Sequence, residues 1–187
     1  MNILIVGVGG QGSLLASRIL GSVFTKQGLA VKVSEVHGMA QRGGSVVTTV
    51  RAGREVYSPL VPEGEADLLI ALEPLEALRQ AHMLKPGGAA VVNTRKIPPM
   101  PVLNGTAEYP ENIQGVFGAE RSLFIDAATL AEVAGSIKSV NVVMLGAASV
   151  WVDAEPELWR AALEECVKPK LMGVNQTAFG LGRQASK

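Results

Sequence analysis

The chain has 187 residues, of which 48% are hydrophobic, so it is long enough to bury the core of one domain. Its 17 Lys and Arg residues balance 17 Asp and Glu residues, which excludes a general basic surface for nucleic acid or anionic lipid. No apolar run approaches the roughly 20 residues that span a bilayer, and the first residues lack a basic signal segment, so we expect a cytoplasmic protein.

The first predicted elements surround a glycine-rich turn. The apolar segment 3–6 precedes glycines with GxGxxG spacing, and residues 14–24 then have helical periodicity that ends near Gly28. This order predicts the strand, turn and helix of a nucleotide-type βαβ unit, where the helix N-terminus attracts a phosphate or carboxylate. The alternative is that the glycines only permit close packing. The candidate contacts with a cofactor or partner are Gly7, Gly9, Gly10, Gln11 and Gly12.

A second distinctive loop follows the next predicted strand, 30–36. Glu35 lies about 20 residues beyond the turn, where a dinucleotide fold places its ribose-binding acid. The loop after it is rich in hydrogen-bond donors and glycines, and we predict that it contacts a partner or an active site. His37 is the one candidate for catalytic proton transfer, although interface contact explains the loop better. The candidate residues are His37, Gly38, Met39, Gln41, Arg42, Gly43 and Gly44.

The segment 45–74 is expected to add strands to the sheet. Residues 45–51 alternate with high β propensity, and the turn near Gly53 predicts a β-hairpin with residues 55–58, antiparallel to the rest. Residues 66–72 form a buried strand that ends at Glu73, before a helix over 74–84. Glu73 is a secondary candidate for ligand binding. The alternative is a solvated carboxylate that stabilises the helix N-terminus.

The remainder predicts a further strand, a long irregular segment and several helices. Residues 89–93 read as a buried strand after a turn at 85–88, and the prolines within 95–114 argue against regular structure there. The role of 95–121 is not predicted. Expected next are a strand over 122–126 and helices over 127–134, 140–150, 156–167 and 175–181. The chain is therefore expected to be a single Rossmann-like, three-layer α/β domain over 1–187, with a mostly parallel sheet and an antiparallel hairpin.

Cys166, on the predicted helix 156–167, is the only cysteine. One thiol forms no intrachain disulfide, and iron-sulfur clusters take about four thiolates, so we expect no metal site on this chain alone. Cys166 shares an apolar stripe with Trp159, Ala162 and Leu163, and is interpreted as a small buried hydrophobe rather than a nucleophile.

The GxGGQG turn at 7–12, followed by EVHGMAQRGG at 35–44, resembles the gamma-type subunits or domains of 2-oxoacid:ferredoxin oxidoreductases. Within that family, the resemblance is strongest to the small subunits of enzymes that act on indolepyruvate. It implies a larger partner that carries thiamine diphosphate, magnesium and iron-sulfur clusters, oxidises an arylpyruvate, reduces ferredoxin and transfers the acyl group to coenzyme A. The chain itself is then expected to bind no cofactor alone, because it has neither cluster cysteines nor a GDG segment for thiamine diphosphate, and to be inactive by itself.

Two alternatives use the same residues differently. A stand-alone NAD(P)-dependent reductase would bind its cofactor through the glycine turn and Glu35, although no convincing hydride-transfer constellation accompanies them. A nucleotide-sensing module would need only the turn.

Overall fold

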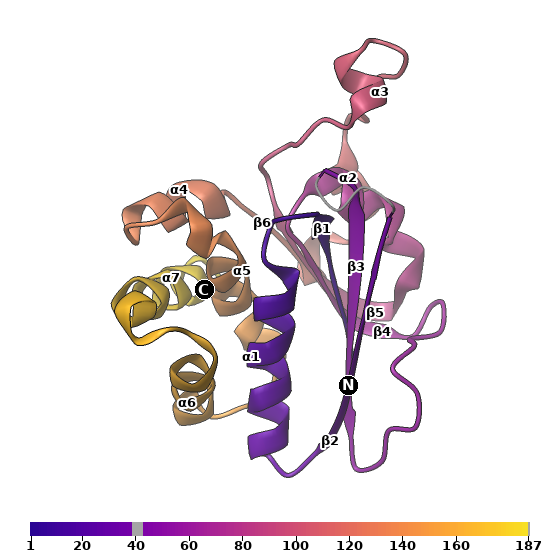
Figure 1. Cartoon of the computed structure of the whole chain (residues 1–187). Helices are drawn as coiled ribbons and strands as arrows, with labels where there is room; N and C mark the ends of the chain where they lie inside the picture. Colours follow the sequence, from indigo (N-terminus) through magenta and orange to yellow (C-terminus); the bar gives the residue numbers. More distant parts are fainter. Residues whose placement is uncertain (39–42, 187) are drawn as a thin grey trace.

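The computed structural model describes residues 1–38 and 43–186 (Figure 1). Six strands form one sheet in the order β2-β3-β1-β4-β5-β6. The strands are β1 (Asn2–Val8), β2 (Ala30–His37), β3 (Ser45–Gly53), β4 (Ala66–Ala71), β5 (Leu84–Asn93) and β6 (Ser122–Ile125). The four strands from β1 to β6 in that order are parallel neighbours, whereas β3 pairs antiparallel with both β1 and β2. The predicted mostly parallel α/β fold is confirmed.

The antiparallel addition differs from the predicted hairpin. Residues 55–58 form no strand; instead β3 folds back on β2 and lies between β2 and β1. The Arg51 guanidinium donates to the carbonyls of Ser58 and Leu60, so a side chain rather than a strand ladder holds this segment. Because β3 separates β1 from β2, the first strand-helix-strand unit runs in the expected directions but its two strands are not neighbours.

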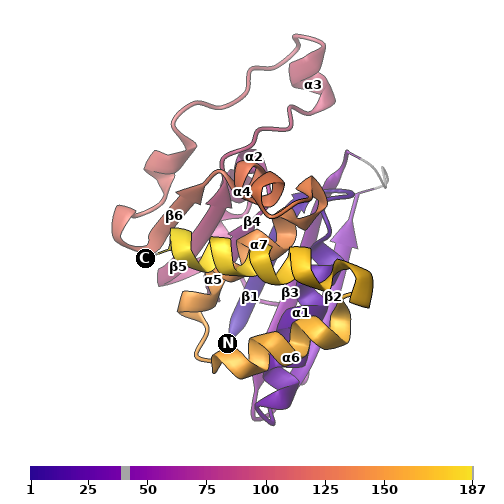
Figure 2. The same ribbon diagram turned by 90° about the vertical axis from the view of Figure 1, so that its left-hand side faces the viewer.

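The helices are distributed unequally over the two faces of the sheet (Figures 1 and 2). Five of them lie on one side, which we call the helical face: α1 (Ser13–Lys26), α4 (Ala127–Val133), α5 (Val140–Ala148), α6 (Pro156–Cys166) and α7 (Met172–Ala185). The opposite side, the thin face, is covered by α2 (Pro74–Arg79), η2 (Ile113–Val116) and irregular segments. The three-layer arrangement is therefore lopsided.

Alternation along the strands supplies both cores. Ile3 and Ile5 of β1 pack among the helices of the helical face, whereas Leu4 and Val6 face the other way. On the helical face, α5 and α7 approach unusually closely. A Cβ atom on Gly146 would lie 2.0 Å from the Phe179 carbonyl oxygen, and one on Gly182 would lie 1.9 Å from that of Val143. Two glycines therefore allow the backbones of these helices to touch.

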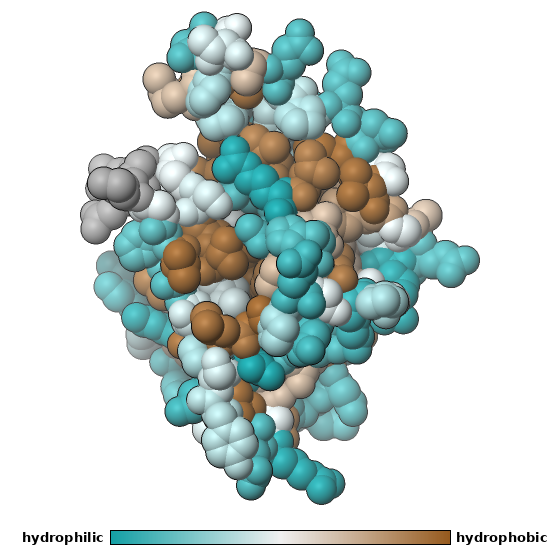
Figure 3. Space-filling model, turned by 90° about the vertical axis from the view of Figure 1, so that its right-hand side faces the viewer, coloured by the Kyte–Doolittle hydropathy of each residue, from teal (hydrophilic) through white to brown (hydrophobic). Residues whose placement is uncertain are grey.

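Apolar side chains remain exposed on the thin face, where they gather in several places (Figure 3). Three are well exposed: Val36 of β2, Leu60 of the 54–65 segment and Val116 of η2. The reason is that short and irregular elements replace the long helices of an evenly covered sheet.

Several predicted boundaries need correction. The helix expected over 74–84 ends at Arg79, and η1 (Ala81–Met83) follows it directly into β5. The turn expected at 85–88 lies within β5, where the pairing with β4 shifts between Ala66 and Leu68. The segment expected to be irregular contains one short helix, α3 (Met100–Leu103), and α7 is longer than its prediction. The remaining short helices are η3 (Ala119–Arg121), η4 (Ile137–Ser139), η5 (Ser149–Trp151) and η6 (Pro169–Leu171).

Candidate functional site

The glycine turn joins β1 to α1 through backbone shapes that favour glycine. Gly10 and Gly12 have φ values of 100° and 85°, in the left-handed region. The Gln11 side chain folds back over the strand ends, where its Oε1 accepts from the Val8 N–H at 2.7 Å and its Nε2 donates to the Leu72 carbonyl at 2.9 Å. A Cβ atom on Gly7 would lie 2.7 Å from that Oε1. Gly7 and Gln11 therefore shape the turn from within.

The turn is also fixed from the helical face. Asn141, which is 2% exposed, donates from Nδ2 to the Gly12 carbonyl at 3.0 Å. Gly12 is the N-cap residue of α1, and no side chain caps this helix. Among residues 1–38 and 43–186, no side chain accepts from the first-turn N–H groups of α1, and a helix N-terminus in this condition attracts an anion.

The two sequence motifs meet in space. The Gly9 N–H donates to the Gly44 carbonyl at 2.9 Å, and the Gly38 N–H donates to the Ser45 carbonyl at 3.2 Å. Of the candidate loop, His37, Gly38, Gly43 and Gly44 are described. Met39, Gln41 and Arg42 lie outside the described residues, so their predicted contacts stay predictions. The described ends place the second loop beside the glycine turn.

Glu35 and His37 border one side of the turn. They line a depression of about 400 Å³ together with residues of the turn, α1 and β3: Gly9, Gly10, Gly12, Ser13, Leu14 and Val46. Glu35 Oε2 accepts from the hydroxyls of Ser13 and Thr48, each at 2.9 Å. His37 is exposed and hydrogen-bonds to no described side chain. The acid predicted for a ribose is thus held by two hydroxyl groups of the chain.

A second depression, on the other side of the turn, is basic. We call it the basic crevice; its volume is about 430 Å³, and its lining comprises Gly10, Gln11, Gly12, Asn93, Arg95, Ile97, Ile137, Lys138 and Val140. Arg95 and Lys138 are the charged residues of this lining, and both are exposed. Two cations beside a helix N-terminus favour an anionic guest. The crevice lies at the carboxyl ends of β1 and β5, where α/β sheets bind ligands.

Asn93 supports the floor of the basic crevice. Its Nδ2 donates to the same Leu72 carbonyl that Gln11 binds, at 3.1 Å, and its Oδ1 accepts from the Ala127 N–H at 3.2 Å. Because Asn93 is fully buried, these bonds join β4, β5 and α4 behind the glycine turn. The floor is therefore rigidly tied to the sheet.

Glu73 is buried and bonded, not solvated as the alternative prediction held. It is 1% exposed, and as the N-cap residue of α2 its Oε2 accepts from the Glu76 N–H at 3.0 Å. Its Oε1 accepts from the Ile97 N–H at 3.1 Å and from the Tyr109 hydroxyl at 2.5 Å. Both carboxylate oxygens are thus engaged by the chain, and Glu73 fixes α2 to the segment between β5 and β6.

Tyr109 completes this cluster. Its hydroxyl also accepts from the Leu75 N–H at 3.1 Å, and the Lys96 ammonium lies 4.8 Å from its ring centroid. Burial, followed by the hydrogen bond to Glu73, raises the pKa of Tyr109 above its ordinary value. The phenol therefore remains a donor to Glu73 at neutral pH.

Glu76 links the cluster to the second loop. Its Oε2 accepts from the Ser45 hydroxyl at 2.5 Å, and the Arg79 guanidinium lies 3.5 Å from its Oε1. Since Ser45 directly follows Gly44, the end of the loop is joined to α2 by a buried carboxylate that is 4% exposed.

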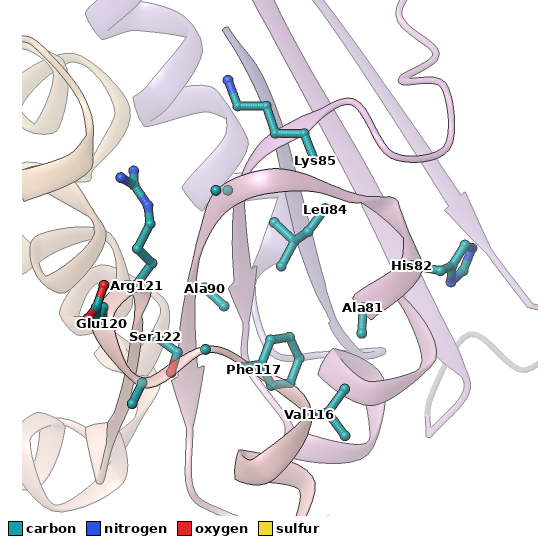
Figure 4. A pocket seen from close by; sticks show the side chains of 14 residues that line it. Ala81, His82, Leu84, Lys85, Ala90, Val116, Phe117, Glu120, Arg121 and Ser122 are labelled. Atoms are coloured by element: carbon teal, nitrogen blue, oxygen red, sulfur yellow. The ribbon is translucent and has the colours of Figure 1, made fainter.

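A larger depression, of about 750 Å³, lies away from these loops (Figure 4). It is formed at the start of β5 and β6, with the Leu84 and Phe117 side chains directed into it and His82 directed outward. Its position at the amino ends of the strands separates it from the glycine turn. Cys166 also lies elsewhere, half-buried against the helical core, where burial raises the pKa of its thiol.

Sequence reasoning missed several of the residues that build the site. Asn141 and Asn93 carry a signal in retrospect, because each is a polar residue within an otherwise apolar helix or strand. Tyr109 carries none, since it lies among prolines far along the chain from Glu73. Arg95 and Lys138 are ordinary surface cations that only the fold brings to one crevice.

Among the described residues, no cluster of three or more His, Cys, Asp or Glu side chains could hold a metal ion. No helix over those residues is long and apolar enough to cross a membrane.

The comparisons with known families cover nearly the whole chain. Residues 2–185 match the family model described as pyruvate ferredoxin/flavodoxin oxidoreductase. An indolepyruvate oxidoreductase subunit IorB of Thermococcus kodakarensis is 44% identical, over 100% of this chain and 96% of that protein. The protein of the same name from Archaeoglobus fulgidus is 43% identical, over 97% of this chain and 93% of its own length.

Solved structures show the same fold. The gamma subunit of a keto/oxoacid ferredoxin oxidoreductase from Geobacter sulfurreducens superposes with a TM-score of 0.74 at 22% identity, covering 99% of this chain and 97% of that chain. A 2-oxoglutarate:ferredoxin oxidoreductase from Magnetococcus marinus gives a TM-score of 0.74 at 21% identity, and the match covers 100% of this chain but 31% of that longer chain. The fold thus occurs both as a separate chain and as part of a longer one.

Proposed function

Because this chain belongs to the pyruvate ferredoxin/flavodoxin oxidoreductase family, we propose that it is a subunit of a 2-oxoacid:ferredoxin oxidoreductase that acts on indolepyruvate or a related arylpyruvate. The assembled enzyme oxidatively decarboxylates the 2-oxoacid to an acyl-CoA and reduces ferredoxin. The observation that carries this proposal is the 44% identity, from end to end, with an indolepyruvate oxidoreductase subunit. In this proposal residues 1–187 act as one domain in the cytoplasm; both statements stay predictions from the sequence.

The redox cofactors belong, in this proposal, to a larger partner subunit. The single cysteine of the chain does not supply the thiolates of an iron-sulfur cluster, and the described residues offer no group of metal ligands. In this proposal that partner holds thiamine diphosphate, magnesium and the clusters, so no step of the reaction is assigned to them here. The contribution of the chain is to complete the site that the partner carries.

We assign the basic crevice to an anionic part of the co-substrate coenzyme A. Its lining has two cations and the glycine turn, including Gly12, the N-cap residue of α1, but no carboxylate, which suits a phosphate group. The depression beside Glu35 has the opposite character, because it presents a carboxylate whose Oε2 already accepts two hydroxyl donors. This difference favours coenzyme A over a dinucleotide, which would use both depressions.

The alternative functions have no support among the relatives reported above. A stand-alone NAD(P)-dependent reductase or a nucleotide-sensing module would bind a nucleotide without a partner. Calorimetry of the isolated chain with NADH and NADPH tests both, and we expect no binding at micromolar concentration. Binding that Glu35→Ala abolishes would contradict the subunit assignment.

Reconstitution tests the proposal directly. The chain would be produced alone and together with the larger subunit encoded by the same organism, and each preparation would be assayed with indolepyruvate, coenzyme A and a viologen acceptor. We expect turnover only from the two-subunit preparation. Turnover by the isolated chain, or failure of the two chains to co-purify, would refute it.

A further inference from the structure

The segment between β5 and β6 leaves the body of the protein and returns to it (Figures 1 and 2). Both views show α3 beyond the rest of the molecule, at the end of the sheet where the glycine turn and α2 lie. We call residues 98–108 the tip, and Ile97 and Tyr109 the neck. The sequence prediction of irregular structure gave no function to this segment, and the assignments above use only its neck.

Hydrogen bonds within the tip give it a folded shape of its own. The N–H groups of Val102 and Leu103 donate to the Pro99 carbonyl, and those of Thr106 and Ala107 donate to the Pro101 carbonyl. The Thr106 hydroxyl donates to Asn104 Oδ1 at 2.8 Å. Within the described part of the chain, no hydrogen bond of residues 98–108 leaves the tip. The fold thus sets the shape of the tip before any partner arrives.

The tip presents apolar side chains to solvent without charge. Met100 is 69% exposed and Leu103 is 65% exposed, and neither packs on the two hydrophobic cores. Residues 97–107 include no Asp, Glu, Lys or Arg, whereas charged residues stand on both sides at Lys96 and Glu108. Exposed large apolar residues on a projecting, preformed element are typical of a binding surface.

The neck holds the tip in a fixed direction. Ile97 and Tyr109, the two residues that bound the tip, both donate to the same buried oxygen, Glu73 Oε1. Beyond the neck, Ile113 and Phe117 are buried in the core of the thin face. A surface anchored in this way loses little conformational entropy when it binds, which favours tight association.

From these observations we propose that the tip is a docking knob, whose Met100 and Leu103 side chains enter an uncharged apolar pocket of the larger subunit. This inference rests on the proposed function, because it takes that subunit as the occupant. The position of the tip supports this choice, because it projects at the end of the sheet that carries the basic crevice. In the proposed function that crevice completes the site of the larger subunit, so the larger subunit lies within reach of the tip.

The test compares two double variants of the full chain for association with the larger subunit. Met100→Ser with Leu103→Ser removes the apolar surface of the tip. Val133→Ser with Leu171→Ser is the matched control, since it removes two exposed apolar side chains from the helical side. We expect the tip variant to bind at least tenfold more weakly than the parent by calorimetry, with an unchanged melting temperature, and the control to bind like the parent.

The outcomes separate this inference from the proposed function. If the parent and the tip variant both bind the larger subunit with the same affinity, the docking knob is refuted and the proposed function stands. If the parent does not bind that subunit at all, both are refuted. If the isolated parent is a dimer by analytical ultracentrifugation and the tip variant is a monomer, the occupant is a second copy of this chain, which contradicts the proposal.

A neck variant provides a second readout. Tyr109→Phe leaves the apolar side chains of the tip in place but removes the hydrogen bond from the neck residue Tyr109 to Glu73. We expect a twofold to fivefold loss of affinity that appears mainly as slower association in stopped-flow mixing, because a less firmly held tip meets its pocket less often. An association rate equal to that of the parent would count against the fixed direction of the knob.

Discussion

The two faces of the sheet are covered in different ways. The helical face is closed by five helices, and its closest contact, between α5 and α7, joins backbone to backbone at Gly146 and Gly182. The thin face is covered by the short elements α2 and η2, and it contains the two buried carboxylates found among the described residues, Glu73 and Glu76. Apolar packing stabilises both faces, and hydrogen bonds to buried carboxylates are added on the second. One of these carboxylates, Glu73, also holds the neck of the tip.

The largest expected effect tests the helical face. Gly146→Ala places a methyl group 2.0 Å from the Phe179 carbonyl oxygen, a contact that backbone atoms do not easily relieve. We expect a loss of about 3 to 5 kcal/mol in the free energy of unfolding, measured by urea denaturation. Gly180→Ala in α7 is the control, because a Cβ atom there has open space, and it should be neutral or stabilising by up to about 1 kcal/mol.

The next effect tests the thin face. Glu73→Ala removes the acceptor of the Glu76 and Ile97 N–H groups and of the Tyr109 hydroxyl. We expect a loss of about 2 to 3 kcal/mol, with faster hydrogen exchange over 97–117 and unchanged exchange in α5 and α7. Glu120→Ala, at an exposed position of the same segment, is the control. If exchange in α5 and α7 rises as much as in 97–117, the two faces do not open separately.

A third experiment concerns the crevice at the edge of both faces. Arg95→Ala with Lys138→Ala removes its two cations, and we expect the apparent KM for coenzyme A of the assembled enzyme to rise roughly 5- to 30-fold, as for a loss of about 1 to 2 kcal/mol. Arg160→Ala with Lys170→Ala makes the same change of charge at exposed positions elsewhere. An equal rise in both double variants would indicate long-range electrostatics rather than a phosphate contact.

The smallest expected effect concerns the pH dependence of stability, to which Tyr109 contributes on the thin face. The Tyr109 pKa is raised in the folded chain, so its stabilising contribution is complete below the ordinary tyrosine value of about 10 and is lost as the pH rises above it. Tyr109→Phe should cost about 1 kcal/mol at neutral pH and should flatten the decline of stability in the alkaline range. Tyr57→Phe, at an exposed tyrosine, should leave the decline in place. Parallel stability curves for parent and Tyr109→Phe would contradict this role.

Apolar periodicity predicted the six strands of the sheet and most of the helices, since it reflects burial on one or both sides, but the strand predicted over 55–58 is wrong. It did not predict the place of β3, because the alternation of residues 45–51 gives a strand but not its neighbours. The hydrogen-bonded cluster around Glu73 was missed for a similar reason. Glu73, Ile97 and Tyr109 lie up to 36 positions apart, and only the path of the chain through α3 brings them together.

The motif residues themselves were found from sequence, but their contacts were not. Glycine spacing indicated a turn, whereas the inward fold of Gln11 and the bond from Gly9 to Gly44 depend on which strand lies beside β1. Because β3 is that neighbour, the end of the 37–44 loop lies beside the glycine turn. If β2 were the neighbour, the start of this loop would lie there. A local pattern thus predicts an element, while its partners follow from the tertiary fold.

The insertion of β3 between β1 and β2 has a consequence for synthesis on the ribosome. The strand made first, β1, occupies the middle of the sheet, and its two neighbours are β3 and β4, which are translated much later. Until Ala71 has emerged, one edge of β1 has no partner, and Leu4 and Val6, which face away from α1, remain uncovered. Closing such distant pairs is slow, so the nascent chain passes through a stage in which an apolar strand awaits its neighbours. Chaperone binding to ribosome-bound chains that end between Gly53 and Ala71 would reveal that stage.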